Sequence, residues 1–156
     1  GRFFVAFSYH PPPPPPHPFR GPTTLFAALF GPPGRVYVYR SYGIHWCFNI
    51  VCREEGHGAG VLVRALEPLH GLERMRERRK VADDRLLCAG PGRVGQALGI
   101  DLRHNRMAVH APPFGLRPPD APVEVRSGPR IGITRALEVP WRFGLAGSAF
   151  LSRPLP

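Results

Sequence analysis

Five aromatic or polar residues that could bind a ligand fall on predicted strands or turns in the first half of the chain: Tyr39, Tyr42, His45, Asn49 and Arg64. Aromatic rings stack on nucleobases, and arginine binds phosphate oxygens bidentately. A general base is harder to find, because no Asp or Glu precedes Glu54. This part of the chain can therefore supply groups that hold a ligand, but it lacks an early carboxylate that could activate water.

Motifs of several common enzyme classes are missing. The chain contains no P-loop, no H-E-x-x-H and no G-x-S-x-G, and its 7 histidines are scattered. Cys47, Cys52 and Cys88 form no C-x-x-C pair, which predicts neither a disulfide framework nor a zinc site and suits a reducing compartment. No apolar run approaches the ~20 residues of a membrane span, so we expect no membrane association.

The charge of the chain favours an anionic partner. The formal net charge is +10, and Lys80 is the only lysine, so arginine supplies nearly all of the positive charge. A GC-rich genome would also enrich arginine codons, so part of this bias can be mutational. Nucleic acid is the favoured partner, with ribosome-like or membrane-surface binding as competing interpretations.

Residues 34–51 predict the β-hairpin around which the chain is organised. Val36 to Tyr39 suit one strand, and alternating apolar residues from Ile44 to Ile50 suit the next. Tyr42 lies at the turn, where small polar residues are usual. Its ring either folds back onto the hairpin or projects toward a partner, for example between base steps of DNA.

Further elements predict a single mixed α+β domain with a curved, mostly antiparallel sheet and two or three short helices. A strand is expected over 61–66, where Arg64 interrupts an apolar pattern. A helix is expected with Pro68 in its first turn and with Leu69, Leu72 and Met75 as its buried stripe. A second helix is expected after Gly90-Pro91-Gly92 and ends at Gly99. The basic run 74–80 suits a solvated helix face or phosphate contact. Short strands are expected over 107–110, 123–125, 130–134 and 141–151.

Two sequence runs resemble the alkyladenine (3-methyladenine) DNA glycosylase family. They are YVYRSYGIHWCFN, beginning at Tyr37, and RALEPLHGLE, beginning at Arg64. The likeness extends over about residues 17–152 and is densest between residues 31 and 101. It implies a compact mixed α/β fold and an enzyme that flips a damaged purine, such as 3-methyladenine or hypoxanthine, from duplex DNA and hydrolyses its N-glycosidic bond without metal or cofactor.

The resemblance also implies a role for each matching residue. Tyr42 corresponds to the intercalating tyrosine, and Ile44 and His45 correspond to positions that line the minor groove. Asn49 corresponds to a residue that disfavours normal guanine, and Arg64 corresponds to the arginine that positions the attacking water. The alternatives are a satisfied amide for Asn49 and a structural ion pair with Glu67 for Arg64. The residues that would hold or close over the flipped base are Tyr9, His17, Tyr39, Asn49 and Ile131.

The chain departs from the family pattern near its beginning. The family has a Glu-x-Tyr motif whose glutamate is the general base, and the alignment that matches Tyr9 places Phe7 at the glutamate position. We therefore divide the chain into a divergent or truncated segment, 1–30, with a polyproline loop, and a glycosylase-like domain, 31–156. Either the base has been lost, or a frame error altered this segment; both predict little or no activity.

The remaining expectations concern reaction type, partners and location. Lys80 lies in the basic run, which disfavours a Schiff-base lyase and favours monofunctional hydrolysis. The expected partner is double-stranded DNA with a damaged purine, bound by a monomer in the bacterial cytoplasm near the nucleoid. The rival interpretations are a non-catalytic damaged-DNA-binding relative or degenerate fragment, and an RNA-binding or ribosome-associated domain.

Overall fold

The computed structural model describes residues 6–10, 27–131 and 139–155, with side chains from residue 27 onward. The described strands are β1 (Ala6–His10), β2 (Val36–Ser41), β3 (His45–Cys52), β4 (Ala59–Ala65), β5 (Val125–Gly128) and β6 (Arg142–Leu145). The described helices are η1 (Ala28–Phe30), α2 (Leu72–Arg79), α3 (Asp84–Leu87), α4 (Pro91–Leu98) and η2 (Leu102–His104).

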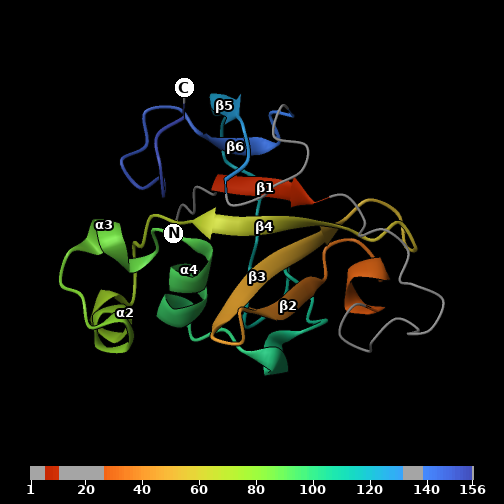
Figure 1. The fold of residues 1–156 in the computed structure, drawn as a ribbon, viewed down its shortest axis with the longest axis horizontal. Coiled ribbons are helices and arrows are strands. Elements are labelled where there is room, and N and C mark those ends of the chain that lie inside the picture. Colours follow the sequence, from red (N-terminus) through yellow and green to blue (C-terminus); the bar gives the residue numbers. More distant parts are fainter. Residues whose placement is uncertain (1–5, 11–26, 132–138, 156) are drawn as a thin grey trace.

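The strands of the described residues form one six-stranded sheet in the order β2-β3-β4-β1-β6-β5, and every strand pair is antiparallel. Figure 1 shows the strands stacked from β2 to β5, with α2, α3 and α4 gathered at one end of the sheet. The mixed α+β fold class is confirmed. No helix in the described part of the chain is long and apolar enough to cross a membrane.

The predicted hairpin is confirmed in detail. Strands β2 and β3 pair from Val36 with Ile50 to Ser41 with His45. Tyr42 and Gly43 both have positive φ, 50° and 67°, and the Ile44 N–H donates to the Ser41 carbonyl at 3.0 Å. Positive φ at both central residues is the sign of a type I′ turn, whose twist matches that of the flanking strands.

The main hydrophobic core lies on the helix-covered face of the sheet. Its completely or almost completely buried members include Val36, Val38, Val63, Leu87 and Val94. Removing one such side chain from water contributes about 1.5–3 kcal/mol. Trp46 and Ile50 from β3 also pack here, so the alternation of β3 directs its large apolar side chains into this layer.

Helix α4 fits closely against β3. It begins with Gly90 and Pro91 and ends at Gly99, as the sequence predicts. A Cβ on Gly95 would lie 2.1 Å from the Trp46 carbonyl oxygen, so only glycine permits this approach. Residues 90–95 also fit G-x-G-x-x-G, but in this antiparallel sheet they do not follow a strand of a βαβ unit, so a dinucleotide site is not indicated.

Several predicted boundaries were wrong. Helix α2 begins at Leu72, not near Pro68, and Leu69 is 38 % exposed and not part of a buried stripe. Residues 107–110 make only an isolated bridge between Ala108 and Arg35. Strand β6 ends at Leu145, well before the predicted end at residue 151. Hydrophobic pattern alone does not resolve these boundaries, because it does not show how long each connection is.

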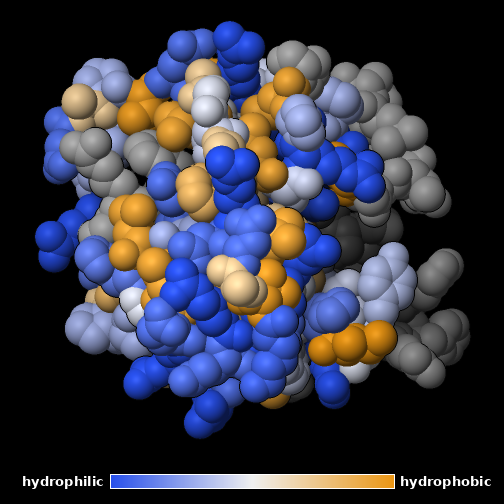
Figure 2. Space-filling model, turned by 90° about the vertical axis from the view of Figure 1, so that its left-hand side faces the viewer, coloured by the Kyte–Doolittle hydropathy of each residue, from blue (hydrophilic) through white to orange (hydrophobic). Residues whose placement is uncertain are grey.

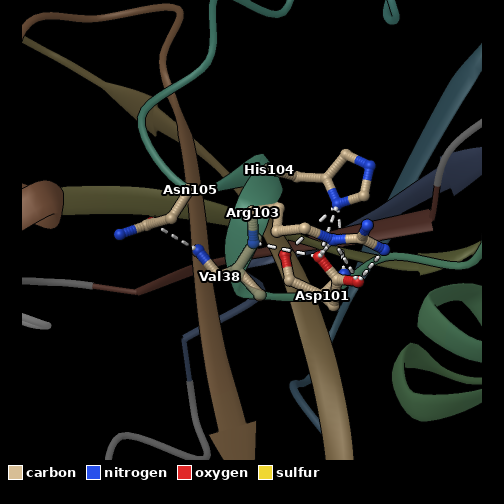
Figure 3. Close-up of polar contacts among 5 residues, drawn as sticks. All are labelled: Val38, Asp101, Arg103, His104 and Asn105. Carbon is tan, nitrogen blue, oxygen red and sulfur yellow. Dashed lines mark hydrogen bonds and ion pairs between the residues drawn. The ribbon is translucent and has the colours of Figure 1, made fainter.

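The outer edge of β2 is covered by the segment that follows η2. Asn105 Oδ1 accepts a hydrogen bond from the Val38 N–H at 3.0 Å, and the Val36 N–H donates to the Met107 carbonyl. Asp101 caps η2 by accepting from the Arg103 N–H at 2.9 Å, as Figure 3 shows. The hairpin is therefore held on both sides, which keeps its turn in a fixed position.

Candidate functional site: a hairpin tip and a polar sheet face

The hairpin tip presents an exposed aromatic side chain. Tyr42 is 92 % exposed and Ile44 is 67 % exposed, and His45 is also exposed. The interpretation in which Tyr42 folds back onto its own hairpin was therefore wrong. Gly92 of α4 lies directly behind His45, because a Cβ there would come within 2.9 Å of the His45 Cβ. The turn thus exposes the Tyr42 ring to solvent, while α4 packs against His45 at the start of β3.

The sheet face opposite the main core carries the polar and aromatic cluster. Tyr39 pairs with Cys47, and Tyr37 pairs with Asn49, so these four side chains share one face. The ring centroids of Tyr37 and Tyr39 are 5.6 Å apart, and the Tyr39 side chain interacts with that of Cys47. Burial raises the pKa values of both tyrosines and of the Cys47 thiol, so all three stay neutral at ordinary pH.

Asn49 is held in one orientation within this face. It is only 2 % exposed, and its Nδ2 donates to the Tyr37 carbonyl at 3.1 Å and to the Cys47 carbonyl at 3.3 Å. The amide nitrogen is therefore satisfied, as the structural alternative requires. In the described part of the chain, its Oδ1 has no protein donor, which leaves the oxygen available to a ligand.

Arg64 is a half-buried cation without a protein partner among the described residues. Its Nε is buried and has no hydrogen bond, and no ion pair with Glu67 occurs there. Burial is the main cause that lowers the pKa of Arg64, followed by the charge of Arg142, while Tyr39 and Cys47 raise it. The electrostatic neighbours place Arg64 beside the Tyr39–Cys47 pair.

Arg142 on β6 is a structural neighbour of Arg64 that sequence reasoning missed. It is 5 % exposed, and its guanidinium donates to the carbonyls of Pro129, Arg153 and Pro154 at 2.9 to 3.1 Å. These bonds attach the segment after β6 to the sheet. No short motif signals this role, whereas Tyr37 and Cys47 could have been found from strand alternation alone.

An open cleft of about 390 Å³ adjoins the hairpin tip. Tyr42, His45 and Cys47 line one side, and the start of α4 with Arg79 and Arg93 lines the other. The volume is within the roughly 300–1,000 Å³ typical of small-molecule sites. Tyr39, Asn49 and Arg64 do not line this cleft, although Cys47 contacts both the cleft and Tyr39.

The backbone of β1 runs next to Arg64. Arg64 has no partner in the pairing of β1 with β4, because Ala6 pairs with Ala65 and the next residue, Phe7, pairs with Val63. The backbone of Phe7 therefore lies next to that of Arg64. Phe7 is the residue that the family alignment places at the position of the catalytic glutamate. Tyr9 pairs with Val61, so Ser8 and not Tyr9 shares a row with Leu62 and Asn49.

The structure does not bring the other predicted site residues into contact with Asn49 or Arg64 among the described residues. The side chains of Phe7 and Tyr9 and the whole of His17 lie outside the described residues. Ile131 is half-buried at the edge of an undescribed stretch, and no described contact joins it to Asn49 or Arg64. The described residues include no group of three potential metal ligands.

The arginine-rich run on α2 is largely engaged in structure. Arg76 pairs with Glu73 and Asp84, Arg78 donates to the Ala97 carbonyl, and Arg79 donates to the Leu87 carbonyl and Gln96. Figure 2 views the side of the molecule where α2 and α3 lie, and hydrophilic residues cover most of it with hydrophobic ones between them. The predicted basic face thus stabilises the helical layer.

Comparison with known proteins decides the family. The model of the methylpurine-DNA glycosylase (MPG) family matches residues 8–149. The chain belongs to the methylpurine-DNA glycosylase family. A protein of Nitrosospira multiformis is 59 % identical over 99 % of this chain and 80 % of its own length. A protein of Rhodopseudomonas palustris is 54 % identical over 94 % of this chain and 74 % of its own length. A protein of Bradyrhizobium diazoefficiens is 52 % identical over 96 % of this chain and 74 % of its own length.

All three bacterial relatives carry the name "Putative 3-methyladenine DNA glycosylase". The family match includes the hairpin with Tyr42, the strand with Arg64 and most of β1. The resemblance inferred from the two sequence runs is therefore confirmed at the level of the family.

Proposed function

We propose that this chain binds duplex DNA containing an alkylated or deaminated purine, such as 3-methyladenine or hypoxanthine, and extrudes the damaged base. The observation that carries the proposal is Tyr42, a 92 % exposed ring on a turn supported by α4 and η2. An aromatic wedge inserted between base steps compensates for the stacking lost when a nucleotide rotates outward. Ile44 and His45 flank the ring and contact the minor groove.

Residues of the polar sheet face receive the extruded base. Tyr39 stacks on it, and a cationic alkylated purine is attracted to the π face of the ring. The Asn49 amide, fixed by its two hydrogen bonds, crowds the purine 2-position and so leaves no room for the exocyclic amine of guanine. Tyr9, His17 and Ile131 complete the enclosure, and Arg64 positions the attacking water. The reaction needs neither metal nor cofactor.

The chain as written has little activity because Phe7 replaces the carboxylate base. Loss of a general base typically costs about 10²–10⁴ in rate. The test is single-turnover release of hypoxanthine and 3-methyladenine from duplex DNA by the unmodified chain and by Phe7→Glu, with Phe7→Gln as an uncharged control. We expect release to rise by about 10²–10⁴ only with glutamate. Rapid release by the unmodified chain would show that the base lies elsewhere.

Hydrolysis leaves an abasic site and does not nick the strand. Schiff-base lyases need an amine nucleophile, and Lys80 is an exposed C-cap residue of α2, away from the polar sheet face. Borohydride should therefore trap no covalent adduct with Phe7→Glu during turnover. A trapped adduct that disappears in Lys80→Arg would contradict monofunctional hydrolysis.

A non-catalytic damage-binding protein is the second candidate, and Phe7 is the observation that favours it. The candidates share the wedge and the polar face, and they differ in whether Phe7→Glu acquires turnover. In both cases the protein acts as a monomer in the bacterial cytoplasm near the nucleoid. In both cases residues 1–30 form a divergent segment and residues 31–156 form the glycosylase-like domain. Tighter binding of lesion-containing duplex than of RNA excludes the RNA-binding alternative.

A further inference from the structure

The surroundings of Arg64 contain positive charge that no described acid neutralises. The charged groups that act on it are Arg142 and Arg153, and the polar groups are Tyr39 and Cys47; no carboxylate is among them. Arg142 differs, because backbone carbonyls of three residues accept from its guanidinium. Arg64 has no such acceptors in the described part of the chain. A buried or half-buried cation is stable when an anion or several acceptors surround it.

The chemistry of the Arg64 guanidinium favours a small carboxylate as its ligand. A guanidinium is a planar fork of N–H donors that matches the two oxygens of a carboxylate. Arg64 is only half-buried, so solvent reaches part of the fork although its Nε is enclosed. Tyr39 and Cys47 remain neutral because burial raises their pKa values, so neither supplies a competing negative charge.

We propose that Arg64 binds a small monocarboxylate from solution, such as formate or acetate, and that the bound carboxylate replaces the missing general base. The second part rests on the proposed glycosylase function, whereas the first does not. Chloride lacks the paired oxygens that match two N–H groups of the guanidinium fork. The excess charge of Arg64, Arg142 and Arg153 favours the carboxylate over neutral solutes.

The rescued reaction keeps the atoms and electrons of hydrolysis in balance. Formate accepts a proton from water while the water oxygen forms a bond to C1′ of the damaged nucleotide. The N-glycosidic bond breaks, and its electron pair leaves with the purine. A purine that departs as an anion takes a proton from solvent, and formic acid returns its proton to solvent.

Thermal unfolding of the full chain tests carboxylate binding without DNA. Sodium formate is compared with sodium chloride at equal ionic strength for the unmodified chain, Arg64→Met, and the control Arg103→Met, whose guanidinium already pairs with Asp101 at 2.6 Å. We expect formate to raise the Tm by about 3–6 °C at tenfold its Kd in the unmodified chain and in the control. Arg64→Met should show no formate-specific shift.

Arg64→Lys provides a second variant that keeps the charge and removes the fork. It should bind formate several-fold more weakly than the unmodified chain, and this comparison remains available if Arg64→Met does not fold. Equal shifts with formate and chloride, or an unchanged shift in Arg64→Lys and Arg64→Met, would overturn the site.

Single-turnover release of hypoxanthine tests the rescue. At equal ionic strength and saturating protein, formate should increase release by about tenfold or more in the unmodified chain, with saturation at the Kd from unfolding. Turnover by Phe7→Glu without a formate effect on the unmodified chain would refute the rescue and leave the proposed function standing. Arg64-dependent formate binding without turnover by any variant would refute the proposed function and leave the anion site standing.

Discussion

The arginines of the helical layer and the arginine on β4 have different surroundings. On α2, Arg76, Arg78 and Arg79 all donate to carboxylates, carbonyls or amides of nearby elements. Arg64 on the neighbouring sheet has a buried Nε without an acceptor in the described residues. These three clustered arginines are therefore structural, whereas the isolated Arg64 is the candidate for binding a ligand.

The difference shows that charge density in a sequence is a weak guide to the site. A run of basic residues on a helix looks like a phosphate-binding face, yet Arg78 and Arg79 donate to carbonyls near the ends of α4 and α3. A single arginine within an apolar strand attracts less notice, but its buried Nε has no hydrogen-bond acceptor in the described part of the chain. Counting hydrogen-bond partners separates the two cases.

The largest expected effect is on turnover through Arg64. In the Phe7→Glu chain, Arg64→Met should lower single-turnover excision by about 10², because a preorganised donor at the reacting water is removed. In the unmodified chain, the same change should leave stability unaltered or raise it by about 1–2 kcal/mol, since a poorly compensated charge is replaced by an apolar group. Urea unfolding measures this, and a marked loss of stability would indicate a hidden structural partner.

The helical layer is sensitive to packing as well as to hydrogen bonds. Gly95→Ala should destabilise the fold by about 1–3 kcal/mol, because its Cβ would lie 2.1 Å from the Trp46 carbonyl oxygen. Gly115→Ala is the matched control, since its Cβ meets nothing within 4 Å, and it should change stability by less than about 0.5 kcal/mol. Similar midpoints in urea for the two variants would refute the close approach of α4 to β3.

Arg79 should behave as a structural arginine. Its Nε donates to the Leu87 carbonyl at 3.0 Å and its Nη1 donates to Gln96 Oε1 at 2.7 Å. Arg79→Met should therefore cost about 1–2 kcal/mol in urea unfolding. The exposed Arg74 makes no hydrogen bond within the described residues, so Arg74→Met should be neutral. If both variants lose DNA affinity equally without loss of stability, the α2 arginines contact phosphate.

The smallest effect concerns an arginine that has its own acid. Hydrogen bonds and charge from Arg103 lower the pKa of Asp101 from 3.8 to about 2. Since the folded-state pKa is depressed, the stability from this pair is present above pH 3.8 and is lost as the pH falls toward 2. Asp101→Asn should flatten the pH dependence of urea unfolding in that window. An unchanged profile would show that the pair contributes nothing.

The sequence predicted those features that are set by local pattern. Alternation over β3 and the glycine at the turn located the hairpin, and Gly90, Pro91 and Gly99 located α4. The same alternation placed Asn49 and Cys47 on one face. Boundaries such as the start of α2 were wrong, because residues 66–71 form a connection whose length the periodicity does not reveal.

The partners of charged residues could not be predicted, because they are distant in the sequence. Arg142 holds carbonyls on both sides of β6, and Arg78 holds the carbonyl of Ala97 at the end of α4. Only the tertiary fold brings these arginines close to the carbonyls that they contact. The absence of a described partner for Arg64 is likewise a property of the folded chain, and it disfavours the alternative interpretation of an ion pair with Glu67.

The most direct test of the account is whether Tyr42 extrudes a damaged purine. The fluorescence of 2-aminopurine beside a hypoxanthine in duplex DNA should rise when the unmodified chain binds, and Tyr42→Phe should preserve the rise. Tyr42→Ala should lower the ratio of extruded to stacked base by a factor of about 5–150, the equivalent of one stacked base. The same rise with Tyr42→Ala, or none with the unmodified chain at saturation, would contradict the assignment of Tyr42 as the inserting residue.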